Sequence, residues 1–125
     1  MQIDVESLTS KETFNLIGSD KVEGTKVFDA DGEHIGHIER VMLDKISGRV
    51  AMAVLAFGGF LGLGQDHYPL PWDKLVYDES LGGYRLSVTR DQLEDAPHYA
   101  EEDWVWTPES GERVYDYYGI SPYWN

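Results

Sequence analysis

Short stretches of strand-forming residues alternate with turn residues between positions 17 and 88, and this punctuation restricts the chain to a small antiparallel β-protein. Most of the turns contain glycine, which accepts the positive φ angles that tight hairpins require. Five or six strands this short are typical of a sheet that curls into a barrel. The expected strands occupy residues 26–28, 33–44, 49–57, 67–72, 75–77 and 84–88.

Two of these strands carry more specific predictions. In residues 33–44 the apolar Ile35 and Ile38 are three positions apart, so strict alternation fails, and Gly36 lies at the break. A bulge or sharp bend at Gly36 is the simplest interpretation. Residues 49–57 are apolar on both parities, which indicates a strand covered on both faces. One face can be the barrel interior, and the other needs a helix, an arm or a second subunit.

The strand at residues 67–72 is expected at an edge of the sheet, because Pro69 and Pro71 occupy alternate positions and lack backbone donors. Apolar alternation in the last strand predicts three inward-facing side chains, those of Tyr84, Leu86 and Val88. One core is expected to contain Val54, Trp72 and Leu86.

Two helices are predicted after the last strand. Thr89 to Gln92 form a capping box that opens a short helix ended by Pro97. Thr107 and Pro108 read as the N-cap and first residue of a second helix, which Gly119 ends. The second helix is expected to present one shared face, formed by Val114, Tyr117 and Tyr118.

Charge divides the chain near Arg90. Acidic residues are concentrated after this position, where Arg113 is the only base. We therefore expect an N-terminal arm over residues 1–16, a barrel domain over residues 17–99, and an acidic, aromatic helical tail over residues 100–125.

Composition excludes several classes of function. The formal net charge of −13 repels nucleic acids and anionic lipids, so neither is an expected partner. The absence of cysteine excludes disulfides, thiolate metal sites and a cysteine nucleophile. No secretory signal and no apolar run long enough to span a bilayer are visible, so the chain is expected to be soluble and cytoplasmic, without direct membrane insertion.

Seven short motifs follow one another along the chain, namely VFDADGEHIGHI at 27–38, VMLD at 41–44, SGRV at 47–50, FGGFLGLG at 57–64, PLPW at 69–72, GY at 83–84 and TRDQL at 89–93. Their order and spacing resemble the PRC-barrel family, which includes the cytoplasmic domain of the photosynthetic reaction-centre H subunit and the C-terminal domain of the ribosome-maturation factor RimM. The resemblance covers residues 17–99 and is closest to free-standing bacterial members, since the membrane helix of the H subunit and the extra domain of RimM are absent. It implies a mainly β fold, a six-stranded, partly open antiparallel barrel that acts as an adaptor without catalytic residues.

Residue types that bind metals or catalyse reactions are present, but not at the spacings of known metal-binding or catalytic motifs. Asp29, Asp31 and Glu33 resemble the start of a calcium loop but lack the later ligands, so a hairpin turn is the better interpretation. The glycine-rich loop at residues 59–64 lacks the motif of a phosphate cradle, and no serine lies in a nucleophile elbow. Catalytic residues, cofactor-binding residues and metal ligands are therefore not expected. The four histidines, in no recognised ligand spacing, are His34, His37, His67 and His98.

Two groups of apolar side chains are candidates for interaction. The glycine-rich loop is either a flexible loop or a contact surface, and its candidates are Phe60, Leu61 and Leu63. The tail either packs on its own barrel or a twin subunit, or binds a different, basic protein. Its candidates are Trp104, Trp106, Tyr117, Tyr118 and Trp124.

These observations predict a non-enzymatic adaptor for protein–protein interaction that also forms a homodimer. The likeness to the H subunit implies a place at a membrane-associated or electron-transfer complex. The alternative function is a small-ligand or metal-binding protein that uses the acidic surface with His34, His37 or His67.

Overall fold

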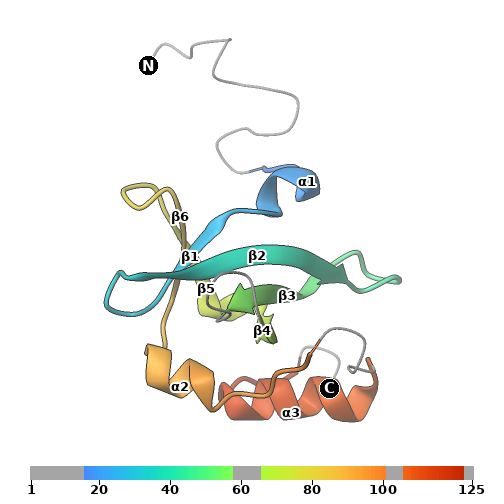
Figure 1. The fold of residues 1–125 in the computed structure, drawn as a ribbon. Helices are drawn as coiled ribbons and strands as arrows, with labels where there is room; N and C mark the ends of the chain where they lie inside the picture. Colours follow the sequence, from blue (N-terminus) through green and yellow to red (C-terminus); the bar gives the residue numbers. More distant parts are fainter. Residues whose placement is uncertain (1–15, 58–65, 101–105, 123–125) are drawn as a thin grey trace.

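The computed structural model of the chain describes residues 16–57, 66–100 and 106–122, and these form an open half-barrel with short helices beside it (Figure 1). Six strands make one sheet in the order β4-β3-β2-β1-β6-β5. The strands are β1 (Lys26–Phe28), β2 (His34–Leu43), β3 (Val50–Phe57), β4 (Asp66–Pro71), β5 (Leu75–Asp78) and β6 (Gly83–Leu86). The helices are α1 (Ser19–Val22), the 3-10 turn η2 (Trp72–Lys74), α2 (Arg90–Glu94) and α3 (Pro108–Tyr117). The mainly β, six-stranded, partly open fold is as expected.

The strand pairing departs from the prediction at one place. All neighbouring strands are antiparallel except β1 and β6, which run parallel with Val27 opposite Tyr84. The description of the sheet as wholly antiparallel was therefore wrong for this pair. The chain leaves β1 through β2 to β5 before β6 returns beside β1, and local turn signals carry no information about such a distant pairing.

The turn between β1 and β2 is held by Asp29. Its buried carboxylate accepts hydrogen bonds from the backbone N–H groups of Asp31 and Glu33, each at 2.9 Å. Gly32 supplies the positive φ of 83°. The carboxylate of Asp29 serves the backbone, which confirms the interpretation of this motif as a hairpin turn.

The irregularity predicted at Gly36 lies one residue earlier. Gly36 pairs with Val27 and His34 with Phe28, so Ile35 is the extra residue of a bulge. Gly36 itself allows close approach of β3, since a Cβ there would lie 2.1 Å from the backbone O of Ala56.

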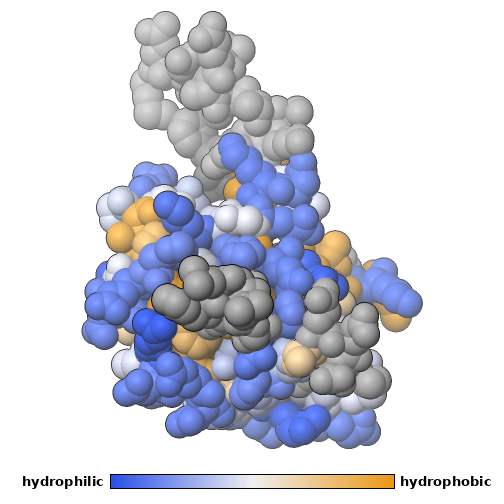
Figure 2. All heavy atoms as spheres, viewed as in Figure 1, coloured by the Kyte–Doolittle hydropathy of each residue, from blue (hydrophilic) through white to orange (hydrophobic). Residues whose placement is uncertain are grey.

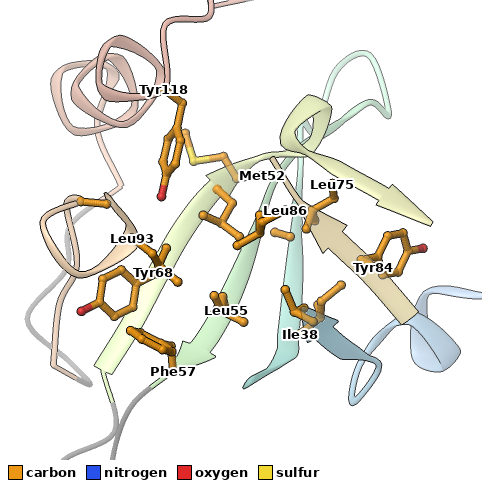
Figure 3. Close-up of a cluster of buried hydrophobic side chains, with 14 of the residues drawn as sticks. Ile38, Met52, Leu55, Phe57, Tyr68, Leu75, Tyr84, Leu86, Leu93 and Tyr118 are labelled. Carbon is orange, nitrogen blue, oxygen red and sulfur yellow. The ribbon is translucent and has the colours of Figure 1, made fainter. Parts of the chain in front are cut away.

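Both faces of β3 are covered, as predicted. Every side chain from Met52 to Phe57 is buried within the single chain, so no second subunit is needed to cover this strand. Leu86 lies in the main hydrophobic cluster and Trp72 packs against it. Val54 is fully buried too, but it lies on the opposite face of β3 from Leu55. Figure 3 shows members of the cluster that converge from the sheet and from α2, among them Ile38, Leu55, Leu75, Leu86 and Leu93.

The two edges of the sheet differ. β4 is an edge strand, as its prolines predicted, with Pro69 opposite Val54 and Pro71 opposite Met52 of β3. On its outer side, His67 and Tyr99 exchange two backbone hydrogen bonds of 2.9 and 3.0 Å. Because Pro69 and Pro71 lack backbone N–H donors and the bridge to Tyr99 occupies His67, little of the outer edge of β4 is left to pair with another strand. β5 forms the other edge.

Candidate interaction surface

Helix α3 joins the residues after the barrel to the sheet. Thr107 caps it, because its Oγ1 accepts from the N–H of Ser110 at 3.1 Å while the Ser110 Oγ accepts from the N–H of Thr107 at 3.0 Å. The helix lies against β4, and Val114, Tyr115 and Tyr118 belong to the same hydrophobic cluster as the sheet. The described part of the tail thus packs on its own barrel.

The buried face of α3 differs in one position from the predicted face. Val114 and Tyr118 are buried as expected, but the third buried large side chain is Tyr115, and Tyr117 is 41% exposed. The Tyr115 hydroxyl donates to the backbone O of Ala51 at 2.6 Å, and burial raises its pKa. Tyr117 lies at the margin, where its hydroxyl donates to the backbone O of Gln92.

The hydroxyl of Tyr118 has no hydrogen-bond partner among the described residues, although it is buried next to Met52 at the end of the cluster (Figure 3). Burial also raises the pKa of Tyr118 far above the ordinary value of 10.0. A buried hydroxyl without a partner costs free energy, because it has lost water and gained nothing in exchange.

Tyr118→Phe is therefore expected to raise the free energy of unfolding by about 1 kcal/mol. The raised pKa of Tyr118 favours the neutral phenol in the folded state of the wild type. The stability that this pKa shift contributes is fully present below the unfolded-state pKa of Tyr118, and it is lost as the pH rises above that pKa. Urea unfolding at about pH 8 and about pH 11 should show a smaller alkaline loss for Tyr118→Phe than for the wild type. If Tyr118→Phe is less stable than the wild type and loses as much stability between these two pH values, the Tyr118 hydroxyl is not an unpartnered buried group.

A cluster of four rings and two carboxylates links β4 to β2 and to residues 98–99. The Nδ1 of the buried His67 lies 2.5 Å from Oε2 of Glu39 on β2, and its ring stacks on Tyr99 at 5.2 Å. The His98 ring stacks on Tyr68 at 4.8 Å, and its Nε2 lies 3.7 Å from Oδ2 of Asp66. The cluster anchors residues 98–99 to the sheet ahead of α3.

The turn between β2 and β3 presents an apolar side chain to solvent. Ile46 is 98% exposed at its tip, and Leu43 at its base is exposed as well. The turn is rigidly bonded: Asp44 Oδ1 accepts from the N–H groups of Ile46 and Ser47 at 2.9 Å each, and the Asp44 backbone O accepts from Gly48. Single exposed apolar side chains are common on protein surfaces, so the distinctive feature of Ile46 is that hydrogen bonds order the turn that carries it.

A scan against protein families matches residues 14–93 to the PRC-barrel domain. The chain belongs to the PRC-barrel family. Its members are small adaptor-type domains that are generally non-catalytic. Among curated proteins, the search finds no match. In the described residues of this PRC-barrel protein, no helix is long and apolar enough to cross a membrane.

The predicted interaction residues of the PRC-barrel chain fall into two groups. Five lie outside the described residues, namely Phe60, Leu61, Leu63, Trp104 and Trp124. Of the three that are described, Trp106 and Tyr117 are 39% and 41% exposed, while Tyr118 faces the core. Trp106 borders a shallow cavity of about 290 Å³ with Met52 and Pro108. The three are close in sequence but do not form one exposed patch.

The histidines of the alternative function are not brought together as metal ligands. His34 is exposed beside Phe28, and His37 lies in the same row of the sheet as His67, but β3 separates them. Within residues 16–57, 66–100 and 106–122, no three His, Asp or Glu side chains are grouped so that they could hold a metal ion. A groove of about 410 Å³ lies between β1 and the β5–β6 turn, and Lys21 and Lys26 line it rather than acidic residues.

Sequence reasoning missed two exposed apolar positions, Ile46 in the β2–β3 turn and Val76 on β5, which are 98% and 62% exposed. The signal for Ile46 was available, because an isoleucine between the turn residues Lys45 and Ser47 has no strand face to join. Figure 2 shows a mostly hydrophilic face on which separate hydrophobic patches lie near the β2–β3 and β5–β6 turns.

Proposed function

We propose that this PRC-barrel protein is a non-enzymatic adaptor that binds another protein through the β2–β3 turn. The observation that carries the proposal is the exposed Ile46 at the tip of a turn that Asp44 holds in one conformation. Because the turn is already ordered, docking of Ile46 into an apolar pocket would cost little conformational entropy.

The chemistry of the other polar side chains supports an adaptor rather than an enzyme. Asp29 and Asp44 bind backbone N–H groups in turns, and Glu39 binds His67. These carboxylates accept hydrogen bonds that hold turns and strands of the fold in place. The likeness to the H subunit extends the proposal to a partner in a membrane-associated or electron-transfer complex.

The proposal is tested by a photo-crosslinking amino acid placed at position 46 in cells, followed by mass spectrometry of the products. The expected result is one other protein captured at position 46. In pull-downs with that protein, Ile46→Asp should lose binding, while the conservative Ile46→Val should retain it. Capture of no protein other than this chain, or equal binding by Ile46→Asp, would show that the turn is not the docking site.

A further inference from the structure

The two edge strands of the sheet, β4 and β5, differ in whether they carry features that block pairing with another strand. The outer side of β4 carries two prolines and the bridge to Tyr99, whereas β5 has no proline and an apolar surface. Val76 and Tyr77 of β5 are 62% and 48% exposed. Exposed, unguarded edge strands attract pairing with another chain, and natural proteins usually protect them.

The outer side of β5 pairs with no strand among the described residues. Leu75 donates its N–H to the backbone O of Trp72, and among the described residues no strand lies beyond β5 in the sheet. Tyr77 contacts Tyr84 of β6 edge to face, with ring centroids 5.3 Å apart. The neighbouring strand thus fixes the strand and its exposed side chains in place.

We propose that two copies of this chain pair through β5, antiparallel, about a two-fold axis that passes between the two Val76 residues. A two-fold axis perpendicular to the sheet keeps each face continuous, so residues opposite each other must have the same parity. Centring on Val76 places Leu75 opposite the partner's Tyr77. The two half-barrels then share one sheet of twelve strands, twice the six of one chain.

Charge selects this register over its neighbour. Centred on Val76, the pairing brings the partner's Asp78 to the start of β5, beside Lys74 at the end of η2, so two pairs of opposite charges flank two valines. Centred on Tyr77, the pairing would place Val76 against Asp78 and form neither charge pair. Opposite charges and apolar pairs stabilise adjacent strands. A buried contact of this kind also offsets the electrostatic repulsion expected between two chains that each carry a net charge of −13.

This pairing is independent of the adaptor function proposed for the β2–β3 turn. That turn lies between β2 and β3, which are separated from β5 by β1 and β6 in the sheet. Loss of the pairing and loss of partner capture at position 46 are therefore separate outcomes.

A single cysteine tests the axis directly, because the chain has no cysteine of its own. Opposite residues of antiparallel strands have Cα atoms about 4.5–5.5 Å apart, within the range that a disulfide accepts. Val76→Cys under mild oxidation should yield about tenfold more covalent dimer than the control Ile46→Cys, which is more exposed than position 76 but far from the axis. Tyr77→Cys should give little, since each Tyr77 faces the partner's Leu75.

Charge reversal tests the register. In sedimentation at tens of micromolar, the wild type should be a dimer, and Lys74→Asp or Asp78→Lys should shift it toward monomer. The double variant carrying both changes restores the opposite charges and should restore the dimer. A monomeric wild type, or no excess crosslinking at position 76, would overturn the proposal. Failure of a small maleimide to label the Val76→Cys variant would show that the chain's own residues cover the edge, and would overturn it too.

Discussion

Deletion of residues 100–125 is expected to leave a barrel that melts at a much lower temperature and aggregates, although the deletion removes net negative charge. Val114, Tyr115 and Tyr118 of α3 are buried in the cluster that fills the sheet. Burial of three such side chains is worth on the order of 5 kcal/mol. Domains of this size are stable by only about 5–15 kcal/mol, so the loss is comparable with the whole stability. Differential scanning calorimetry and light scattering measure both effects.

Two alanine variants within α3 separate packing from deletion of chain. Val114→Ala removes buried atoms and should destabilise, whereas Glu112→Ala changes an exposed position of the same helix and should leave stability nearly unchanged. A truncated barrel that melts like the full-length protein would show that the tail does not stabilise the sheet. Its aromatic residues would then be free for another protein.

Local signals predicted most of the β architecture. The Asp29 turn, the prolines of β4, the capping box at Thr89 and the N-cap at Thr107 lie where the sequence indicated, because each depends on residues within a few positions of one another. The parallel pairing of β1 with β6 and the short helix α1 were not predicted. Pairing across more than fifty residues depends on how the whole sheet closes, and a four-residue helix is too short to leave a periodic pattern.

The buried face of α3 could not be predicted from the periodicity of its apolar residues alone. Tyr115, Tyr117 and Tyr118 all lie within about 100° of Val114 around a helix, so the sequence allows two overlapping faces. Contact with Ala51 and β4 selects the face that contains Tyr115. The choice depends on the neighbouring element and is invisible to the helix alone.

The candidate sites were harder to predict than the fold. An apolar residue in a strand is assigned to the core by default, so Val76 gave no sign that it lies at an exposed edge. Its position became visible only when the order of the strands placed β5 at the end of the sheet. The pair of His67 and Glu39 was likewise hidden, because twenty-eight positions separate them in the sequence.

The second large effect is expected at Leu86, whose side chain is fully buried at the centre of the cluster from β6 (Figure 3). Leu86→Ala should lower the free energy of unfolding by about 2–5 kcal/mol, because the removed atoms leave a cavity that the surrounding strands cannot close. Chemical denaturation monitored by tryptophan fluorescence measures the change.

Val76→Ala is the matched control for Leu86→Ala, since Val76 lies on the strand paired with β6 but points outward. At protein concentrations low enough to exclude pairing, Val76→Ala should shift the midpoint little, because its side chain buries little surface in the single chain. Equal losses of unfolding free energy for the two variants would mean that Leu86 of β6 does not lie in a hydrophobic core shared with β1, β3 and β5. A large loss at Leu86 with a small one at Val76 instead assigns the stability of the barrel to the hydrophobic cluster that Leu86 joins.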